Sequence, residues 1–220
     1  MTPKSLSRCI LLIYFYTCLN SMLAFSFRHY TVKTNVVNRN ALGQTRHDAS
    51  DNSMDKDAYR IGLGYDIHRL VGTGKGGKPF KLGGVLVDDS KIFVVGHSDG
   101  DTLLHALADA LLGATGCGDI GDYFSELDSI NKDMDSRIIL ESAIKEASLR
   151  GYRPTNIDIN IILERVRLGR RLKDAIKKAL YDMLGSDVMI NVKAKTNEGL
   201  DAIGRGEAVS CQVIAHLKRI

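Results

Sequence analysis

From residue 60 onward, the spacing of the apolar residues changes repeatedly along the chain. Apolar residues at every second position, or short β-rich runs between turn residues, predict strands, whereas a spacing of three to four residues predicts helices. We expect strands over residues 60–68, 80–87, 91–95, 156–163, 188–194 and 208–217. We expect helices from Ser98 to Gly113, from Asp135 or Ser136 to Gly151, and over 171–184. This interleaving predicts an α+β fold, a two-layer sandwich of one mixed β-sheet covered on one face by helices.

Turn residues and strand alternation refine this expectation. The polar residues 88–90 separate two β-rich runs, which favours a hairpin of 80–87 with 91–95. Residues 116–133 have the composition of a loop. In the last strand, alternate residues from Val209 to Leu217 form one apolar face, so the second face is free for partner subunits.

The first 56 residues differ in composition from the rest of the chain. They contain seven Lys and Arg against three Asp, whereas residues 57–220 contain 23 basic and 23 acidic side chains. The net charge of +4 therefore comes entirely from the first quarter of the chain. Because the body has no basic stripe interleaved with aromatic residues, a nucleic-acid-binding module is excluded. The body also lacks a run of about 18 apolar residues, so we expect a soluble globular domain that does not enter a membrane.

Two targeting signals are predicted in this leader. Basic residues precede an apolar run over 9–19, and small residues follow it, which is the order of a secretory signal peptide at residues 1–25. The run is short and Asn20 interrupts it, which favours cleavage over the alternative of a membrane anchor. Residues 26–56 have the basic composition of a transit peptide and end in a disordered junction. Together they predict import into a plastid through the secretory route, with the folded domain at 57–220.

The four cysteines divide equally between leader and body. Cys9 and Cys18 lie in the leader, and Cys117 and Cys211 lie in the body without a CxxC spacing. We therefore expect the two body cysteines to be reduced packing residues and not a disulfide framework.

Two glycine-rich segments match nucleotide-binding patterns incompletely. Residues 72–78 (GTGKGGK) follow the P-loop spacing, but Pro79 stands where a Ser or Thr must bind magnesium, and strand-like sequence follows. Residues 116–121 (GCGDIG) fit GxGxxG but follow a helix, whereas that motif needs the turn from a strand into a helix. We interpret the first as a hairpin loop, and the second as a loop that can approach a ligand closely.

Three side chains have the spacing of a metal site. Asp66 and His68, at i and i+2 of the first strand, point to the same face of the sheet. His105 lies on the first helix, with Asp101 one turn before it and Asp109 one turn after it. Two imidazoles and one carboxylate leave a fourth metal position open, which is the pattern of a catalytic zinc site.

Each part of this set also has a simpler explanation. A DxH pair alone is a weak signal, and the stripe of Asp101, His105 and Asp109 is also typical of a solvated helix face. If His105 binds a metal, Asp101 or Asp109 can orient its imidazole through the second nitrogen. His97 lies just before the helix N-terminus, where free backbone N–H groups stabilise an anionic oxygen.

Longer stretches around these residues resemble the 2-C-methyl-D-erythritol 2,4-cyclodiphosphate synthases, enzymes of the non-mevalonate isoprenoid route. The stretches that carry the resemblance are GYDIH, VGHSDGDTLLHALADALLGATGCGDIGDYF, DSR and KAKTNEGLDAIGRGEAVSC. They lie within roughly residues 59–218, nearly the whole body. A plastid-type leader agrees with this resemblance, because eukaryotes keep this route in plastids.

The resemblance implies a role for many residues. The implied metal ligands are Asp66, His68 and His105 for Zn²⁺, and Glu198 for Mg²⁺ or Mn²⁺. His97 and Thr196 would stabilise the transition state. The implied substrate-binding residues near the metal and in a mobile loop are Ser98, Asp119, Gly121, Phe124, Asp128, Lys132, Asp135 and Ser136. Those implied near the nucleotide, its diphosphate or a further anion are Leu163, Arg167, Gly169, Ala194, Lys195 and Arg205. Lys195 stands where many members of the family have Thr.

The implied reaction converts 4-diphosphocytidyl-2-C-methyl-D-erythritol 2-phosphate to the 2,4-cyclodiphosphate and releases CMP, at sites between the subunits of a homotrimer. Two alternatives use the same three metal ligands. In a zinc phosphohydrolase, the metal would activate water instead. A metal-stapled oligomeric binding protein would close the site with a fourth protein ligand, for which the sequence offers no candidate.

Overall fold

The computed structural model describes residues 58–87, 91–125, 128 and 131–220, so the predictions for 1–25 and 26–56 lie outside the described residues. The strands are β1 (Tyr59–Gly72), β2 (Lys78–Pro79), β3 (Lys81–Leu82), β4 (Val85–Leu86), β5 (Ile92–Val95), β6 (Tyr152–Ile162), β7 (Met189–Lys195) and β8 (Ala208–Arg219). The helices are α2 (Thr102–Thr115), α3 (Ile120–Tyr123), α4 (Ser136–Leu149), α5 (Arg170–Leu184) and α6 (Asp201–Gly204).

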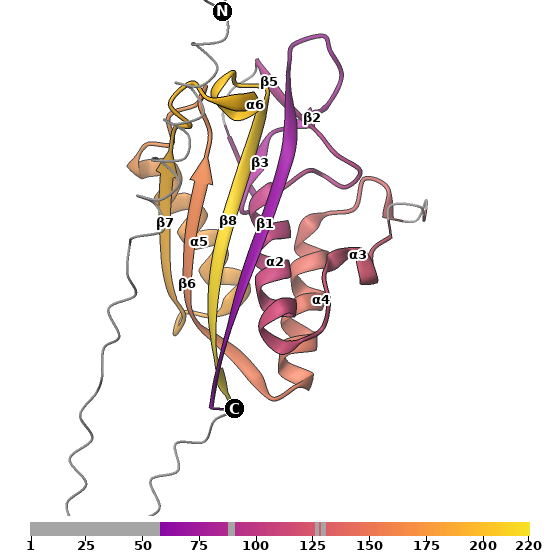
Figure 1. Ribbon diagram of the computed structural model, residues 1–220, viewed down its shortest axis with the longest axis vertical. Helices are drawn as coiled ribbons and strands as arrows, with labels where there is room; N and C mark the ends of the chain where they lie inside the picture. Colours follow the sequence, from indigo (N-terminus) through magenta and orange to yellow (C-terminus); the bar gives the residue numbers. More distant parts are fainter. Residues whose placement is uncertain (1–57, 88–90, 126–127, 129–130) are drawn as a thin grey trace, which may run out of the picture. The chain divides into compact units, whose positions relative to one another are not determined.

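One six-stranded sheet organises the fold. Its strand order is β2-β5-β1-β8-β6-β7, and β3 pairs with β4 in a separate hairpin. The pairing of β6 with β7 is parallel and the other pairings in the sheet are antiparallel, so the sheet is mixed. Helices α2, α4 and α5 lie behind the sheet in the view of Figure 1, in one helical layer. The predicted α+β fold with one covered mixed sheet is therefore confirmed.

The core lies between this sheet and the helices. The predicted apolar face of β8, from Val209 to Leu217 at alternate positions, is fully buried. On β1 the opposite set of residues, from Tyr59 to Ile67 at odd positions, remains 44–71% exposed although all five are apolar or aromatic. One face of the sheet is thus packed against helices, and the other carries a row of uncovered apolar side chains.

The predicted hairpin of residues 80–87 with 91–95 is wrong. Gly83 and Gly84 both have positive φ angles, and they turn the chain so that β3 and β4 pair with each other. Residues 92–95 form β5, which pairs with β1 on one side and β2 on the other. Glycine adopts positive φ without a steric penalty, so the two adjacent glycines define the turn.

The ends of the first helix also differ from the prediction. Asp101, and not Ser98, is the N-cap of α2, and its carboxylate accepts a hydrogen bond from the Leu104 N–H. At the other end the helix continues through Gly113 and stops at Gly116, which has the left-handed conformation common at helix ends. The short helices α3 and α6 were not predicted, because four residues are too few to show a period.

The prediction of reduced cysteines is confirmed for the two thiols in the described part of the chain. Cys117 is half-buried and Cys211 is fully buried, and both are free thiols. Burial raises the pKa of the Cys211 thiol well above its ordinary value, which keeps the sulfur protonated. Among the described helices, none combines the length and apolar character needed to cross a bilayer.

Candidate metal centre and active site

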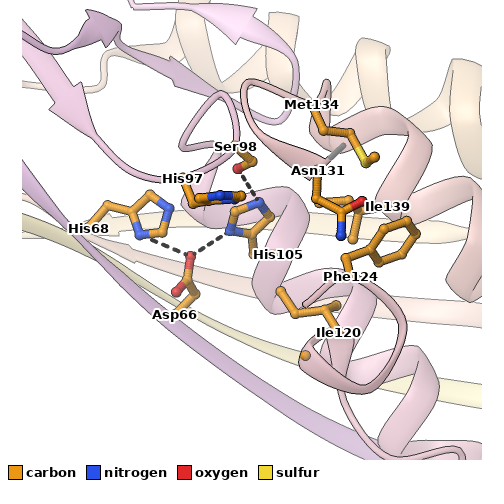
Figure 2. A pocket seen from close by; sticks show the side chains of 11 residues that line it. Asp66, His68, His97, Ser98, His105, Ile120, Phe124, Asn131, Met134 and Ile139 are labelled. Atoms are coloured by element: carbon orange, nitrogen blue, oxygen red, sulfur yellow. Dashed lines mark hydrogen bonds and ion pairs between the residues drawn. The ribbon is translucent and has the colours of Figure 1, made fainter. Parts of the chain in front are cut away.

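Asp66, His68 and His105 converge as the sequence predicts. Asp66 and His68 project from β1 and His105 projects from α2, with one ligand atom of each within 4.8 Å of the others. Asp66 Oδ2 lies 3.1 Å from His105 Nδ1 and 3.6 Å from His68 Nδ1. Figure 2 shows the two imidazoles on either side of this carboxylate. The three side chains therefore form a compact candidate metal centre.

Two glycines of β1 bring the strand close enough to α2 for this contact. A Cβ atom at Gly62 would lie 1.8 Å from the Ala110 carbonyl oxygen, and one at Gly64 would lie 1.8 Å from that of Ala106. These residues alternate on the same face of β1 as Asp66. Because the strand has no side chains at 62 and 64, the helix backbone packs directly on it, and His105 lies opposite Asp66.

The surroundings of His68 leave one nitrogen free for a metal. A Cβ atom at Gly96 would lie 3.1 Å from the His68 ring, and one at Gly100 would lie 3.2 Å from it, so these glycines provide the space for the imidazole. His68 Nδ1 donates to the Ile67 carbonyl oxygen at 2.8 Å. Its Nε2 is buried and has no hydrogen-bond partner. A buried nitrogen without a partner is costly unless it binds something, and a neutral imidazole is a common metal ligand.

His105 is held at both ring nitrogens. Its Nδ1 faces Asp66, and its Nε2 lies 3.0 Å from Ser98 Oγ and 2.9 Å from Ser136 Oγ. Burial lowers the pKa of this imidazole, but the hydrogen bond with Asp66 and the nearby carboxylates outweigh burial, and the pKa in the metal-free protein is raised above 6.5. The ring is therefore fixed in a negatively charged site that favours a cation.

Asp101 and Asp109 have other functions than the predicted orientation of His105. Asp101 is fully buried and accepts hydrogen bonds from the backbone N–H groups of Gly83, Gly84 and Leu104. Burial raises the pKa of its carboxyl group, and the three N–H donors oppose that rise. Asp109 is half-buried and accepts from the Ile120 N–H at 2.9 Å. The alternative of a solvated helix face is also wrong, because this side of α2 packs against the β3–β4 turn and the loop before α3.

A cavity of about 220 Å³ opens beside the three candidate ligands. Among the predicted site residues, those that line it are Asp66, His68, His97, Ser98, His105, Gly121 and Phe124. The sequence reasoning missed four others, Ile120, Asn131, Met134 and Ile139. Three of these, Ile120, Met134 and Ile139, are apolar and belong to no chemical motif. Only their nearness in sequence to Gly121 and Phe124 could have indicated that they line the site. The cavity thus joins a polar wall at the metal centre to an apolar wall from the 116–139 region.

Other residues predicted near the cavity serve the local backbone. The Asp119 carboxylate caps α3 and accepts from the Gly121 N–H, and the Asp135 carboxylate caps α4 and accepts from the Arg137 N–H. The start of α4 at Asp135 and Ser136 agrees with the prediction. Asp128 and Lys132 are exposed to solvent.

Lys78 is a site residue that the sequence reasoning did not identify. Its ammonium group donates to the carbonyl oxygens of Gly96 and His97 at 3.0 Å each, to that of Ser98, and to Asp133 at 2.6 Å. Lys78 is the last residue of the GTGKGGK segment, which lies between strands β1 and β2 and not before a helix. As the sequence predicts, the segment is therefore not a P-loop. Its lysine stabilises the turn that carries His97 through hydrogen bonds to the backbone.

The remaining predicted residues do not line the cavity: most follow β6 or end and follow β7, and Arg205 ends the short helix α6 just before β8. Thr196 Oγ1 donates to Glu198 Oε1 at 2.8 Å, and the Leu163 N–H donates to the Lys195 carbonyl oxygen at 2.9 Å. Arg205 is exposed and pairs with Glu207 at 3.1 Å. Exposed residues of this group are Arg167, Gly169, Lys195, Thr196, Glu198 and Arg205, and those partly or fully covered are Leu163 and Ala194.

The strand register shows how far the metal centre lies from the predicted residues of β7. Asp66 is paired with Cys211, Cys211 with Ile161, and Ile161 with Ala194. Three strand spacings of about 4.8 Å separate Asp66 from Ala194, or about 14 Å in all. One chain therefore presents a metal centre and, well apart from it, a second set of predicted site residues.

An α+β fold with an Asp-His-His cluster beside an open cavity has the arrangement of a metal-dependent enzyme. Comparison with known sequences makes this specific. The profile of the YgbB family matches residues 59–218, and residues 1–58 precede the matched region. The chain belongs to this family.

Relatives and solved structures agree with the family match. The chain is 40% identical over 162 residues to 2-C-methyl-D-erythritol 2,4-cyclodiphosphate synthase of Dechloromonas aromatica, covering 74% of this chain and 98% of the relative. A CDP complex of IspF from Plasmodium falciparum is 34% identical with a TM-score of 0.63, over 74% of this chain and 97% of that one. The synthase structure from Plasmodium vivax has a TM-score of 0.61 at 34% identity, over 74% and 99% of the two chains. The chain is thus an enzyme, a phosphorus–oxygen lyase with 2-C-methyl-D-erythritol 2,4-cyclodiphosphate synthase activity in non-mevalonate isoprenoid synthesis.

Proposed function

We propose that the ion held by Asp66, His68 and His105 is Zn²⁺, and that it binds the β-phosphate of the substrate. The observation that carries this proposal is the cluster itself, in which the buried His68 Nε2 has no partner and the cavity lies open beside it. Two imidazoles and one carboxylate with a free fourth position are the usual ligands of catalytic zinc. When bound, the ion supplies Lewis-acid polarisation and orientation of a phosphoryl oxygen.

In the proposed reaction, an oxygen of the 2-phosphate attacks the β-phosphorus. The bond from the β-phosphorus to the bridging oxygen breaks, and CMP leaves with that electron pair. Since the transfer is intramolecular and needs little proton chemistry, the protein acts mainly by holding the two phosphates in line. His97 lines the cavity, at the turn that Lys78 fastens, and would contact the phosphate there.

The apolar wall of the cavity would exclude water from the reacting phosphates. Ile120, Phe124, Met134 and Ile139 line the side away from the metal centre. Water beside the phosphates would allow hydrolysis to compete with ring closure, and apolar side chains exclude it. Gly121, which lines the cavity, and the neighbouring Asp119 would hold the methylerythritol hydroxyls.

Glu198 would hold Mg²⁺ or Mn²⁺, which would neutralise negative charge on the substrate diphosphate. Mg²⁺ is commonly held by one or two carboxylates together with substrate phosphates, and Glu198 is an exposed carboxylate of that kind. Thr196 Oγ1 already contacts this carboxylate, so Thr196 would lie beside the β-phosphate. The exposed Arg167, with Leu163, Gly169, Ala194 and Lys195, would receive the cytidine and its diphosphate, and Arg205 would face a further anion.

A homotrimer would bring the two groups of residues together. Both ions would act on one diphosphate, yet in one chain three strand spacings, about 14 Å, separate Asp66 from Ala194, four residues before Glu198. The uncovered apolar row on β1, from Tyr59 to Ile67, is a surface that neighbouring copies would bury in a closed ring. The β6–β7 edge of one subunit would then complete the metal centre of the next.

The leader would direct the protein to a plastid through the secretory route. A fusion of residues 1–56 to a fluorescent protein is expected to reach the plastid, and a fusion of 26–56 alone is expected to stay in the cytosol. Retention of the first fusion in secretory compartments would contradict the proposal.

One experiment tests the chemistry directly. The purified protein is analysed for metal content and incubated with substrate, Zn²⁺ and Mg²⁺ while phosphorus NMR follows the products. The expected result is one zinc per chain and a cyclic diphosphate together with CMP. An acyclic phosphate product would instead indicate the phosphohydrolase alternative, and a zinc-free active protein would contradict the metal assignment.

A further inference from the structure

The second nitrogen of His105, Nε2, faces the buried hydroxyl groups of Ser98 and Ser136. Ser136, the first residue of α4, is fully buried, and its Oγ lies 2.9 Å from His105 Nε2. The same Oγ lies 2.5 Å from Asp99 Oδ1. The hydroxyl of Ser136 therefore lies between a candidate metal ligand and a carboxylate that the sequence reasoning did not single out.

The direction of these hydrogen bonds follows from what Asp99 can accept. Asp99 also receives the Lys81 ammonium group at 3.3 Å and the Asp101 N–H at 3.3 Å. With these donors around it, the Asp99 side chain acts as a hydrogen-bond acceptor toward Ser136 Oγ. The Ser136 hydroxyl must then donate its hydrogen to Asp99, and its lone pairs face His105.

This direction fixes the tautomer of His105. An oxygen lone pair facing Nε2 requires a hydrogen on Nε2, so neutral His105 has its lone pair on Nδ1, where an ion can take the place of the proton shared with Asp66. Ser98 Oγ, which accepts from the Gly100 N–H at 3.2 Å, lies 3.0 Å from the same Nε2 and supports the same tautomer. Imidazoles that bind metals are commonly oriented in this way by a partner at the other nitrogen.

The Ser136 hydroxyl is itself held in position by the backbone. The Asp99 N–H donates to the Met134 carbonyl oxygen at 3.0 Å, and the Asp135 carboxylate caps the helix that Ser136 begins. The turn before α2 and the start of α4 are therefore joined at the point where Ser136 meets Asp99.

We infer that Ser136 and Asp99 are positioning residues for the metal centre, which orient His105 so that Nδ1 can bind the ion. This inference rests on the proposed metal site, and it gives Ser136 a role behind the ligand in place of the substrate contact that the resemblance implies. The inference concerns metal affinity and not the chemical step, so metal binding tests it without substrate.

The test measures the Zn²⁺ dissociation constant of the full chain by competition with a chromophoric chelator, and records the visible spectrum of the Co²⁺ form. Ser136→Ala is expected to weaken Zn²⁺ binding about tenfold, the lower end of the usual effect, because Ser98 still contacts Nε2. The Co²⁺ bands should shift in the same variant. Asp99→Asn is expected to weaken binding by a smaller factor, and to add nothing in the Ser136→Ala background, because its effect passes through the hydroxyl.

Ser142→Ala, six residues further along α4, is the matched control and should bind Zn²⁺ as the wild type does. Wild-type affinity in Ser136→Ala, or fully additive effects of the two substitutions, would overturn the inference. If Ser136→Ala does not fold, Asp99→Asn decides alone. A merely structural role would lower the melting temperature of the metal-free variant and leave its Zn²⁺ affinity and Co²⁺ spectrum unchanged.

The outcome is distinguishable from failure of the proposed function. Weakened Zn²⁺ binding in Ser136→Ala, with a wild-type protein that forms no cyclic product, would support the positioning role and contradict the proposed reaction. A wild-type protein that forms the cyclic product, with unchanged Zn²⁺ binding in Ser136→Ala, would support the proposed reaction and contradict the positioning role.

Discussion

The metal centre and the β6–β7 edge differ in how completely one chain builds them. At the metal centre, only 7% of the His105 side chain is exposed and both of its nitrogens have partners. At the β6–β7 edge, Thr196, Glu198 and Arg167 are exposed, and Glu198 is held by a neighbour two residues away. The first region is fixed by the core of the domain, and the second depends on local turns.

This difference indicates how the two regions respond to change. A group fixed by packing is already oriented before substrate arrives, which reduces the entropy lost on binding. An exposed group gains its surroundings when a ligand or a neighbouring subunit covers it. Substitutions at the metal centre should therefore act within one chain, whereas those on the open face of the sheet should act through assembly.

The largest effect is expected for His105→Ala. Loss of one of three ligands should remove the ion and with it several kcal/mol of transition-state stabilisation, so turnover should fall about a thousandfold or more. Metal analysis and CMP release measure the two losses, and circular dichroism reports whether the fold persists. An active, metal-free variant would contradict the mechanism.

Leu63→Lys separates assembly from metal binding. Leu63 is 69% exposed on the apolar row of β1, and a charge there should prevent burial by a neighbouring copy. We expect a monomer by light scattering that still binds Zn²⁺ but loses activity about a hundredfold, because the second group of residues is no longer in place.

Leu149→Lys is the control for this prediction. Leu149 is 68% exposed, but it lies at the end of α4 and not on the open face of the sheet. It should leave both assembly and activity unchanged. A Leu63→Lys variant that is monomeric and fully active would show that one chain forms the complete site.

Gly64→Ala tests how packing forms the metal centre. The added Cβ would meet the Ala106 carbonyl oxygen and force α2 away from β1, at a cost of about 3 kcal/mol by the usual measure of overpacking. Denaturant unfolding should show this loss, and Zn²⁺ affinity should fall because His105 moves with the helix.

The control is Gly113→Ala within α2. Its Cβ would lie 4.0 Å from the Leu63 carbonyl oxygen, an ordinary contact, so alanine should stabilise the helix by up to about 1 kcal/mol. If Gly64→Ala were as stable as the wild type, the close approach of strand and helix would not be required for the site.

The smallest effect is a pH dependence. Because the pKa of His105 is raised above 6.5 in the metal-free protein, a proton competes with the ion at a higher pH than at an ordinary histidine. Zn²⁺ affinity should fall about tenfold per pH unit once the pH drops below that raised pKa.

The stability of the metal-free protein should change with pH in the opposite direction to the Zn²⁺ affinity. The contact of protonated His105 with Asp66 stabilises the metal-free protein fully below the unfolded pKa, and this contribution is lost as the pH rises through the raised folded pKa. Zn²⁺ titrations between pH 5.5 and 8 measure the affinity, and unfolding curves of the metal-free protein over the same range measure the stability. Each change should have the size expected for the titration of about one histidine. An affinity that is constant over this range would contradict the prediction.

Much of the metal centre could be predicted because its parts follow local rules. The two-residue repeat of a strand places Asp66 and His68 on one face, and the helical period places His105 opposite the leucines. The orienting partners could not be predicted in the same way. Asp101 and Asp109 have the right spacing, yet Ser98 and Ser136 make the contacts with His105, because turns and the start of another helix bring them there.

The sequence by itself determined the alternation of strands and helices, the residues able to bind a metal, and the difference in charge between residues 1–56 and the rest, since these depend on periodicity and composition. The tertiary structure decided which groups meet. It paired β3 with β4, set β1 against α2 through two glycines, and left the β6–β7 edge three strands from Asp66. Contacts between residues distant in the chain depend on how whole elements pack, and no local pattern records that packing.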